Sequence, residues 1–334
     1  MSKITVLGAG SWGTALAIML GKMGYEVTLW TVDTNEAEMI NNEHQQKQKL
    51  PDVIIPNNVV STTDMKKSLE NPEIIVCAVP SIYVRETAKA MNEYIKKDSI
   101  VLSVSKGIED VTFKTMTQVI EMEVPNVKLA VMSGPSHAEE VAVGIPTGVV
   151  VASKEQTVAE KIQDTFMNSH FRIYSSSDLM GVELGGSLKN VIALAAGMAD
   201  GIGCGDNTKA ALITRGMAEI ARLGIRMGGK IETFYGMSGI GDLIVTCGSK
   251  HSRNYRAGFL IGQGHKISKV QEEVGMVIEG LNTARAAANL AKRNAVEMPI
   301  IAEVNNIVFL QKDPKDSVEE LMTREKKTEI SFMP

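Results

Sequence analysis

KITVLGAGSWG, residues 3–13, is the stretch that decides the fold of the N-terminal half. Its first part, Lys3–Leu7, is a short apolar run that predicts a buried strand. Thr14–Met23 predicts a helix that ends at Gly24, and Glu26–Trp30 predicts a second strand. The glycine pattern G-x-G-x-x-G therefore lies between a strand and a helix, the context in which it binds a dinucleotide.

The three glycines of this pattern have separate physical roles. Gly8 permits a tight turn, Gly10 lets the backbone approach a pyrophosphate, and Gly13 lets the helix pack close to the strand. The helix N-terminus offers N–H groups and a partial positive charge to the same ligand. The alternative is a glycine-rich turn without a ligand. A Walker A pattern is not found in the sequence, which disfavours a P-loop nucleotidase.

Strands and helices continue to alternate up to residue 177. Further strands are predicted at Glu73–Val79, Ser99–Ser103, Lys128–Met132, Thr147–Ala152 and Phe171–Tyr174, and helices at Tyr83–Ile95, Thr112–Met122 and Glu155–Met167. This order predicts a parallel, doubly wound α/β sheet of the Rossmann type, whose ligands bind beyond the carboxyl ends of the strands. Lys106 follows one of these strands. It is either an exposed loop lysine or a contact for an anion or a carbonyl.

The residue that reads the adenosine ribose is expected about 20 residues after the glycine pattern. Thr31 and Val32 lie there, and Asp33 follows. If Asp33 reaches the ribose, NAD is preferred. If it points away, Thr31 leaves room for a 2′-phosphate, but an arginine that could hold this group is missing. The sequence favours NAD, and the charged run Glu36–Lys49 predicts a solvated helix and loop.

Ser133–Glu139, SGPSHAE, follows a predicted strand. Ser136 and Glu139 have the spacing of a capping box, with Ser136 as the N-cap. This pattern accounts for both residues structurally. It also places a helix N-terminus at a strand end, where an anionic ligand would bind. His137 is not assigned a catalytic role.

Leu184–Ala199, LGGSLKNVIALAAGMA, predicts a helix that is buried nearly all round, with glycines and alanines that let other backbones come close. Lys189 is the only charged residue between its ends. A buried lysine loses hydration, and its pKa moves readily, which suits proton transfer near neutral pH. The alternative is a lysine that reaches the surface or pairs with a structural carboxylate. Asp242, in the apolar run GIGDLIV, is the natural counter-ion.

From Asp178 onward the sequence predicts helices only, at Asp178–Asp200, Thr208–Leu223, Asn254–Ile261, Leu281–Arg293, Ile300–Leu310 and Ser317–Met322. We therefore expect residues 1–177 to form a dinucleotide-binding domain and residues 178–334 an all-helical substrate and catalytic domain. Ser252, Arg253 and Asn254 begin a predicted helix, where their hydroxyl, guanidinium and amide groups suit a phosphate. The alternative is plain N-capping by Ser252, with Arg253 in solvent.

The composition excludes several classes of protein. The chain has 334 residues, a net charge of -4 and a pI of about 5.9, so it lacks the basic character of a nucleic-acid-binding protein. Its three cysteines lie far apart, which predicts neither a zinc site nor a disulfide framework and suits a reducing compartment. Neither a signal peptide nor an uninterrupted membrane-spanning run is predicted, so we expect a cytoplasmic protein without membrane insertion.

Seven motifs follow one another along nearly the whole chain. They are GAGSWGTALA (Gly8–Ala17), SKG (Ser105–Gly107), SGPSHAEEVA (Ser133–Ala142), LKNVIALAAG (Leu188–Gly197), GIGDLIVTC (Gly239–Cys247), SRNYRAG (Ser252–Gly258) and VIEG (Val277–Gly280). In this order they resemble the NAD(P)-dependent glycerol-3-phosphate dehydrogenases of bacterial type. The resemblance implies a Rossmann-type domain followed by a helical domain like the C-terminal domain of 6-phosphogluconate dehydrogenase.

The resemblance also implies roles for single residues. Lys189 would be the catalytic proton acceptor. The small phosphorylated substrate would contact Lys106, Gly134, Ser136, Lys189, Asp242, Ser252, Arg253 and Asn254. The NAD or NADP cofactor would contact Gly8, Gly10, Ser11, Trp12, Gly13, Lys106, Ala138, Arg253, Val277 and Glu279. The resemblance further implies a cytoplasmic homodimer that supplies glycerol 3-phosphate for phospholipid synthesis, without a metal and without a nucleic-acid partner.

Two positions depart from the family pattern. Many members carry arginine or histidine where this chain has Thr31 and Val32, and many have Tyr-Leu-Pro where it has Lys49-Leu50-Pro51. Both positions belong to the adenosine side, so the choice between NAD and NADP stays open while the reaction is unaffected. Two rival functions remain: a dehydrogenase of the same plan that acts on a hydroxy acid or sugar acid, and a dinucleotide sensor without turnover.

Overall fold

The computed structural model describes residues 2–326 and 328–329. Contacts within the chain divide it into two compact units. Unit 1 consists of residues 1–105 and 116–179, and unit 2 consists of residues 106–115 and 180–334. The chain therefore passes from unit 1 to unit 2, returns, and passes over again.

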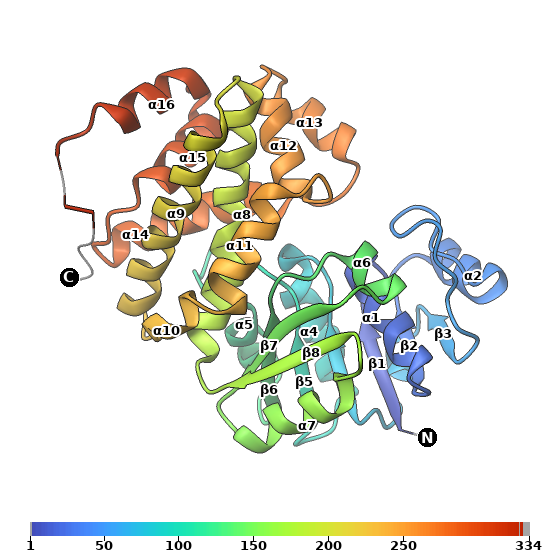
Figure 1. Ribbon diagram of the computed structural model, residues 1–334. Helices are drawn as coiled ribbons and strands as arrows, with labels where there is room; N and C mark the ends of the chain where they lie inside the picture. Colours follow the sequence, from blue (N-terminus) through green and yellow to red (C-terminus); the bar gives the residue numbers. More distant parts are fainter. Residues whose placement is uncertain (1, 327, 330–334) are drawn as a thin grey trace. The chain divides into compact units, whose positions relative to one another are not determined.

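Unit 1 is built on one eight-stranded sheet (Figure 1). Its strands are β1 (Lys3–Leu7), β2 (Glu26–Trp30), β3 (Val59–Thr62), β4 (Ile74–Cys77), β5 (Ile100–Ser103), β6 (Lys128–Ser133), β7 (Thr147–Ser153) and β8 (Phe171–Ser176). Their order in the sheet is β3-β2-β1-β4-β5-β6-β7-β8. The predicted doubly wound sheet is confirmed, and β3 is the one strand that the sequence interpretation missed. The expectation of a wholly parallel sheet was wrong for one pair of strands.

One pair of neighbours, β6 and β7, is antiparallel, while all other neighbouring strands are parallel. The connection between β6 and β7 contains only α6 (Ala138–Val143), a helix of 6 residues. Such a helix extends roughly 9 Å, whereas a strand of the length of β6 extends about 20 Å. The helix is too short to carry the chain back along the sheet, so β7 runs in the opposite direction to β6.

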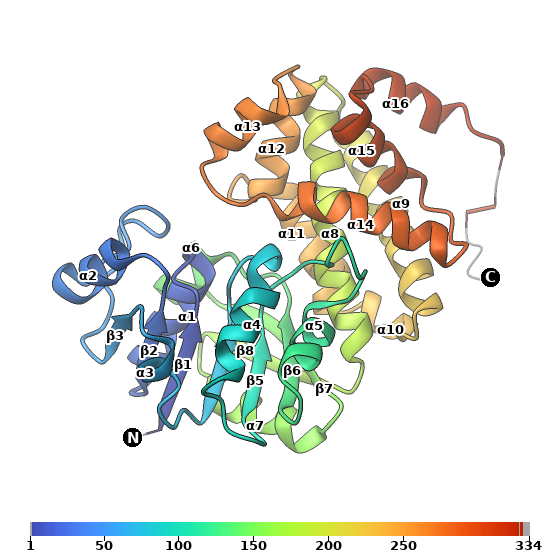
Figure 2. The ribbon, with the colours of Figure 1, turned by 180° about the vertical axis from the view of Figure 1, so that it is seen from behind.

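The remaining helices of unit 1 cover the two faces of the sheet. They are α1 (Ser11–Lys22), α2 (Thr34–Glu43), α3 (Met65–Ser68), the 3-10 turn η1 (Ser81–Tyr83), α4 (Val84–Asn92), α5 (Met116–Glu123) and α7 (Gln156–Phe166). One core joins the sheet to α1, α6 and α7, and a second joins it to α3, α4 and α5. Figure 2 shows α4 and α5 on this second face. Within β4, Ile74 and Val76 enter the first core, and Ile75 and Cys77 the second, because side chains alternate along a strand.

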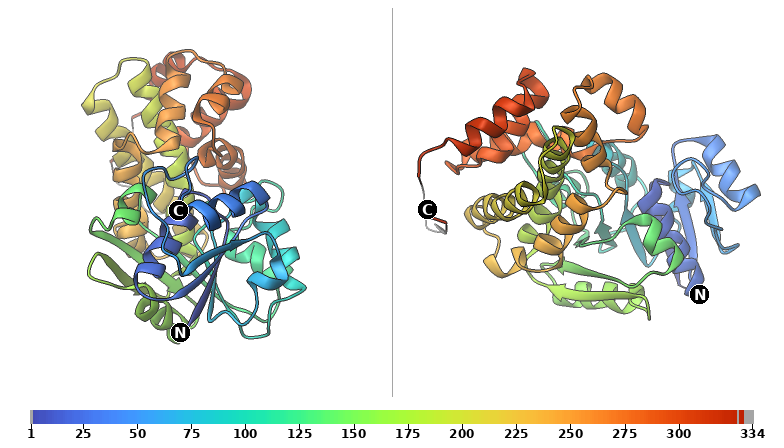
Figure 3. Two further views of the ribbon diagram at one scale, coloured as in Figure 1. Left: turned by 90° about the vertical axis from the view of Figure 1, so that its right-hand side faces the viewer. Right: turned by 45° about the horizontal axis from the view of Figure 1, so that its top comes forward.

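Unit 2 is helical, as predicted (Figure 3). Its helices are α8 (Leu179–Gly201), α9 (Asp206–Arg226), α10 (Ile231–Phe234), the π-helical turn η2 (Met237–Gly241), α11 (Asp242–Gly248), α12 (Arg253–Gly262), α13 (Ile267–Val274), α14 (Glu279–Arg293), α15 (Pro299–Leu310) and α16 (Pro314–Met322). Every residue from Gly181 to Ala199 is buried, so α8 is the central helix of this unit, as its sequence predicts.

Helices α8 and α12 pack backbone against backbone. A Cβ atom on Gly197 would lie 2.1 Å from the carbonyl oxygen of Tyr255, and a Cβ atom on Gly258 would lie 2.1 Å from that of Leu194. Only glycine fits at either position, because real Cβ atoms do not approach other atoms so closely. The close contact places the N-terminus of α12 beside the middle of α8.

By length and composition, α8 could cross a membrane, since its polar interruptions are few. Within unit 2, however, 89% of its most apolar window is buried among other parts of the chain. A core helix of a folded domain has the same property.

The segment 106–115 departs from the sequence-based prediction. A helix was expected from Thr112, but α5 begins at Met116. Phe113 has a φ of 59°, a left-handed conformation that a helix cannot include. The segment instead folds back on itself through a bridge between Ile108 and Thr115 and packs within unit 2. There the Ser187 hydroxyl donates to the Gly107 carbonyl at 3.1 Å, and the Thr115 hydroxyl donates to Glu183 at 2.7 Å.

Candidate active site

In unit 1, the glycine turn has the geometry that a pyrophosphate requires. Gly8 has a φ of 114°, and a Cβ atom on Gly13 would lie 2.0 Å from the carbonyl oxygen of Gly8. By contrast, a Cβ atom on Gly10 would meet nothing within 4 Å, so the backbone is open on that side. Helix α1 begins at Ser11 with no side-chain cap and no acidic residue in its first turn. Its N-terminal N–H groups, beside Trp12, therefore suit a phosphate ligand.

At the end of β2, where the group that binds the adenosine ribose is expected, the structure departs from the prediction at Glu36. Asp33 caps α2, because its carboxylate accepts hydrogen bonds from the backbone N–H groups of Asn35 and Glu36. Glu36 was expected in a solvated run, but it is buried and accepts hydrogen bonds from Thr31, Gln46 and Lys49. That expectation was wrong at this position. Its three donors come from the end of β2 and from a loop, so helical periodicity does not reveal them.

The loop after β6 holds Gly134, Ser136 and Ala138. Gly134 has a φ of 147°, and a Cβ atom on it would lie 2.9 Å from Val149, so the turn requires glycine. The predicted capping box is wrong. The N-cap of α6 is His137, without a side-chain cap, and the helix begins at Ala138. The Ser136 hydroxyl instead donates to the Gly134 carbonyl at 2.9 Å, a local bond that competes with capping.

In unit 2, a buried carboxylate joins two lysines. The Lys189 ammonium donates to Oδ1 of Asp242, and the Lys106 ammonium donates to Oδ2 at 2.7 Å. Lys189 is 6% exposed and Asp242 is 1% exposed. Lys189 also donates to the Thr246 hydroxyl at 2.6 Å, and that hydroxyl donates to the backbone carbonyl of Asp242. The predicted counter-ion of Lys189 is therefore in place.

Burial and charge act in opposite directions on this cluster. Burial lowers the pKa of Lys189 from 10.5 to about 8; the Asp242 carboxylate opposes this shift and the Lys106 charge adds to it. Burial alone would raise the pKa of the Asp242 carboxyl, but the charges of Lys106 and Lys189 outweigh burial, and the pKa is lowered. Near neutral pH, Lys189 is thus poised to gain or lose a proton while Asp242 stays ionised.

The N-terminus of α12 carries Ser252, Arg253 and Asn254. Ser252 is the N-cap, and its hydroxyl accepts a hydrogen bond from the backbone N–H of Tyr255 at 3.2 Å. The Asn254 amide donates to Asn190 at 2.9 Å and accepts from the backbone N–H of Gly280 at 2.8 Å. Asn190 adjoins Lys189 in α8. The amide of Asn254 therefore ties the α12 N-terminus to the helix that carries the buried lysine.

Arg253 links this N-terminus to the loop before α14. Its guanidinium donates to the carbonyl oxygen of Val277 at 3.4 Å, and both residues are half-buried. Glu279, also half-buried, is the first residue of α14. One side of the guanidinium therefore contacts the backbone of the loop before α14.

The predicted site residues therefore fall into two groups. Unit 1 holds Gly8, Gly10, Ser11, Trp12, Gly13, Gly134, Ser136 and Ala138, and unit 2 holds Lys106, Lys189, Asp242, Ser252, Arg253, Asn254, Val277 and Glu279. The sequence interpretation did not assign roles to Thr246 and Asn190. Both had a signal: Thr246 lies one helical turn after Asp242, and Asn190 follows Lys189 in the chain.

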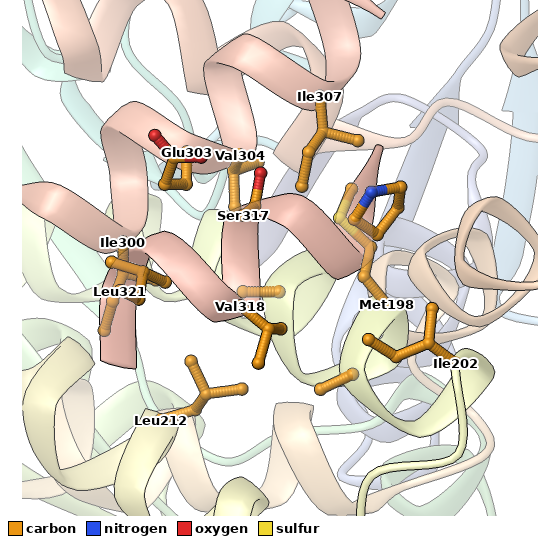
Figure 4. A pocket seen from close by; sticks show the side chains of 13 residues that line it. Met198, Ile202, Leu212, Ile300, Glu303, Val304, Ile307, Ser317, Val318 and Leu321 are labelled. Carbon is orange, nitrogen blue, oxygen red and sulfur yellow. The ribbon is translucent and has the colours of Figure 1, made fainter. Parts of the chain in front are cut away.

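A cavity of about 30 Å³ lies in unit 2 between α8, α9, α15 and α16 (Figure 4). Its walls are mainly apolar, with Met198, Leu212 and Ile307 among them, and Glu303 at one side. It contains none of the predicted site residues. Among residues 2–326 and 328–329, no cluster of three or more His, Cys, Asp or Glu side chains could hold a metal ion.

Comparison with known proteins gives a consistent result. Residues 3–159 match the sequence family described as NAD-dependent glycerol-3-phosphate dehydrogenase N-terminus, and residues 178–319 match the corresponding C-terminus family. A protein from Agathobacter rectalis named glycerol-3-phosphate dehydrogenase (NAD(P)+) is 53% identical over 333 residues, covering 100% of this chain and 99% of its own length. A protein of the same name from Fusobacterium nucleatum is 51% identical over 332 residues, covering 99% of both chains.

A solved structure is similar over the whole fold. The crystal structure of glycerol-3-phosphate dehydrogenase from Coxiella burnetii superposes with a TM-score of 0.94 at 37% sequence identity. The match covers 97% of this chain and 99% of that chain.

Proposed function

The chain belongs to the family of NAD-dependent glycerol-3-phosphate dehydrogenases, and we propose that the Lys189 cluster of unit 2 carries its oxidoreductase activity. The reaction interconverts sn-glycerol 3-phosphate and dihydroxyacetone phosphate with NAD or NADP. The observation that supports this assignment is the buried lysine, which one carboxylate and one hydroxyl hold in place. This arrangement presents a buried nitrogen that can transfer a proton.

The glycine turn of unit 1 fits a nicotinamide dinucleotide, because Gly10 is open and the N-terminus of α1 lacks a side-chain cap. We assign the binding of this cofactor to Gly8, Gly10, Ser11, Trp12, Gly13, Ala138, Lys106, Arg253, Val277 and Glu279. Residues 1–177 are the proposed dinucleotide-binding domain, and residues 178–334, joined by segment 106–115, the substrate domain. When bound, the cofactor supplies the group that exchanges hydride with C2 of the substrate.

Lys189 moves the proton. In the oxidative direction its neutral amine takes the proton of the C2 hydroxyl, and in the reductive direction its ammonium donates a proton to the carbonyl oxygen. Asp242 stays ionised and stabilises the ammonium that forms. Because the Thr246 hydroxyl donates to the Asp242 carbonyl, its oxygen lone pairs face Lys189 and orient the nitrogen.

The remaining residues hold the substrate. Arg253, Ser252 and Asn254 are assigned to its phosphate, together with the N–H groups at the start of α12. Lys106, fixed by the second oxygen of Asp242, is assigned to the substrate oxygens near C2. Gly134 and Ser136 of unit 1 complete the proposed substrate contacts. The family's requirement for a small phosphorylated substrate agrees with this donor set.

The cellular setting is part of the same proposal. We assign the protein to the cytoplasm, as a homodimer that supplies glycerol 3-phosphate for phospholipid synthesis. It would act without a metal, a nucleic-acid partner or membrane insertion. The net charge of -4 and the absence of a basic surface signature in the sequence support the exclusion of nucleic acid.

Substitution of Lys189 by methionine tests the mechanism. Methionine fills a similar volume but cannot transfer a proton, so kcat for dihydroxyacetone phosphate reduction should fall by at least about 10²–10⁴-fold. The change is measured by the loss of reduced-cofactor absorbance. The Kd for NADH, measured by fluorescence titration, should change little.

Lys269→Met, on the exposed face of α13, serves as the matched control and should keep full activity. If Lys189→Met turned over at the wild-type rate, Lys189 would have no part in proton transfer. If the wild-type protein oxidised NADH with a keto acid as substrate, forming a hydroxy acid, but not with dihydroxyacetone phosphate, the substrate assignment would be wrong.

A further inference from the structure

The adenosine end of the dinucleotide site contains a buried carboxylate that the proposed reaction does not use. Glu36 is 6% exposed and accepts hydrogen bonds from the Thr31 hydroxyl, the Gln46 amide and the Lys49 ammonium. Gln46 is 1% exposed, and its amide also donates to the carbonyl oxygen of Ala9 at 3.1 Å. The network therefore ties the end of β2 and the loop after α2 to the glycine turn itself.

The position of this network is that of the ribose-reading group. In a Rossmann sheet, an acidic side chain at the carboxyl end of the second strand binds the adenosine ribose. Thr31 is the first residue after β2, and its bond to Glu36 places the carboxylate at that strand end. Lys49 is the only cation bonded to Glu36 among the residues that the structure describes, and its side chain is 34% exposed.

The charges at this strand end disfavour a second phosphate. Among the described residues that bond within this network and cap α2, Glu36 and Asp33 are carboxylates and Lys49 is the one ammonium, which leaves one net negative charge. A ribose 2′-hydroxyl is neutral and can donate a hydrogen bond to a carboxylate. A 2′-phosphate carries about two negative charges and would find the one ammonium already paired.

We propose that Glu36, by pairing with Lys49, determines the coenzyme preference of this chain and selects NAD(H) over NADP(H). This inference rests on the proposed function, because it concerns the cofactor of the same reaction. The relatives' names include both coenzymes and do not separate them. Glu36 acts here as a specificity-determining residue and takes no part in proton or hydride transfer.

A purely structural role for Glu36 predicts a different outcome. If the carboxylate only fastened the loop to β2, its loss would loosen the whole adenosine site and weaken both coenzymes alike. If it sets the preference, neutralising it while keeping its shape should free Lys49 and strengthen the binding of NADPH alone. Glu36→Gln keeps the size and one acceptor oxygen, so it separates the two cases.

The test measures the Kd of NADH and of NADPH for the full-length protein by fluorescence titration, at fixed pH and low salt. Wild-type protein should bind NADH more tightly. Glu36→Gln should tighten NADPH at least about fivefold, the effect of one charge pair in a high-dielectric setting, with little change for NADH. In the double variant with Lys49→Gln, this gain should disappear. Glu43→Gln removes a carboxylate from the exposed Glu43–Lys47 pair on the same helix and should leave the preference unchanged.

Lys49→Gln alone gives a second measurement, which is useful should Glu36→Gln not fold. It leaves Glu36 unpaired, so NADPH binding should weaken more than NADH binding. Equal affinity for both coenzymes in the wild type, or equal weakening of both by Glu36→Gln, would overturn the selection by Glu36 and leave the proposed reaction intact. Failure of the wild type to bind either coenzyme would overturn the proposed function itself.

Discussion

Asp242 shows how a buried charge is kept ionised at a working site. A carboxylate that is 1% exposed is costly unless every lone pair has a partner. Here one oxygen faces Lys189 and the other faces Lys106, so both charges of the site depend on the same group. The cost of burial is offset by these two ion pairs. Burial lowers the pKa of Lys189, and the Asp242 carboxylate limits this shift.

This pKa predicts opposite pH profiles for the two directions of the reaction. Reduction of dihydroxyacetone phosphate needs the Lys189 ammonium, so its kcat/KM should fall as the pH rises through about 8. Oxidation of glycerol 3-phosphate needs the neutral amine, so its kcat/KM should rise through the same pH. Asp242→Asn removes the charge that raises the Lys189 pKa, and the midpoint should move to lower pH. Steady-state kinetics between pH 6 and 10, roughly the range around this pKa, provide the measurement.

An unchanged midpoint in Asp242→Asn would show that Asp242 does not control the titrating group. Loss of activity without any pH shift would point to Asp242 as a purely structural residue.

Arg253 is expected to bind the substrate phosphate and to have little effect on the chemistry. Arg253→Ala should raise KM for dihydroxyacetone phosphate by about 10- to 100-fold, because a charge-assisted hydrogen bond is lost. Inorganic phosphate, which competes for the same donors, should then inhibit less. Arg256→Ala, on the exposed face one turn further along α12, is the control and should leave both values unchanged. If KM stayed the same in Arg253→Ala, the phosphate would have to bind elsewhere.

At the scale of elements, the contact between α8 and α12 fixes the site. Lys189 lies on α8 and Arg253 begins α12, so the separation of the two helices sets the distance between the proton-transferring group and the phosphate donors. Glycines on both helices allow this separation to be short, and the reciprocal contacts of Gly197 and Gly258 lock it.

Gly258→Ala should therefore destabilise the protein. The added methyl group would lie 2.1 Å from the Leu194 carbonyl oxygen, and the helices must move apart. Overpacking of this kind costs typically about 1–3 kcal/mol, and backbone atoms on both sides favour the upper end. Urea unfolding monitored by circular dichroism gives the change in the free energy of unfolding. Gly248→Ala, where a Cβ atom meets nothing within 4 Å, is the control. Equal stability of the two variants would contradict the close-packing argument.

Local sequence patterns account for most of the elements. The burial of α8 and the alternation of strands and helices in unit 1 follow from residue periodicity, which a sequence displays directly. The capping box failed because the Ser136 hydroxyl has a local alternative: it donates to the Gly134 carbonyl, a bond that competes with accepting from a backbone N–H of α6. The start of α15 shows the same limit. Its cap is the buried Glu219 of α9, which accepts from the backbone N–H groups of Ile300 and Ile301.

The candidate site was predictable to a similar degree. The pairing of Lys189 with Asp242 was foreseen, because a buried lysine needs a counter-ion and one acid lies in an apolar run. The burial of Glu36 was not foreseen, since its donors Gln46 and Lys49 come from a loop without periodicity. Nor was the membership of Lys106 in unit 2, which depends on the left-handed turn at Phe113 and on contacts distant in sequence.

At the scale of the whole molecule, each unit holds a distinct part of the chemistry. The charged groups assigned to proton transfer and phosphate binding lie in unit 2, and the glycine turn lies in unit 1. Hydrogen exchange should reveal this division. Glycerol 3-phosphate alone should slow amide exchange in segment 106–115 and in residues 242–262, whereas NADH alone should slow it in residues 8–23 and 31–50. Mass spectrometry of peptic fragments provides the readout.

A mutant in which Arg253 is replaced by alanine gives the control for the first pattern, since glycerol 3-phosphate should then protect residues 242–262 less. Protection of residues 8–23 by glycerol 3-phosphate alone, equal to that by NADH, would contradict the assignment of the glycine turn to the cofactor.

Segment 106–115 has a consequence for how such proteins can be recombined. A chimera made by a single crossover near residue 177 would take Asp242 from one parent and its second lysine, Lys106, from the other. Glu183 of α8 and its hydrogen-bond partner Thr115 would likewise come from different parents. To transfer the complete helical unit, both segments 106–115 and 180–334 must be exchanged together. The ten-residue segment is needed because it carries the second lysine of the Asp242 cluster.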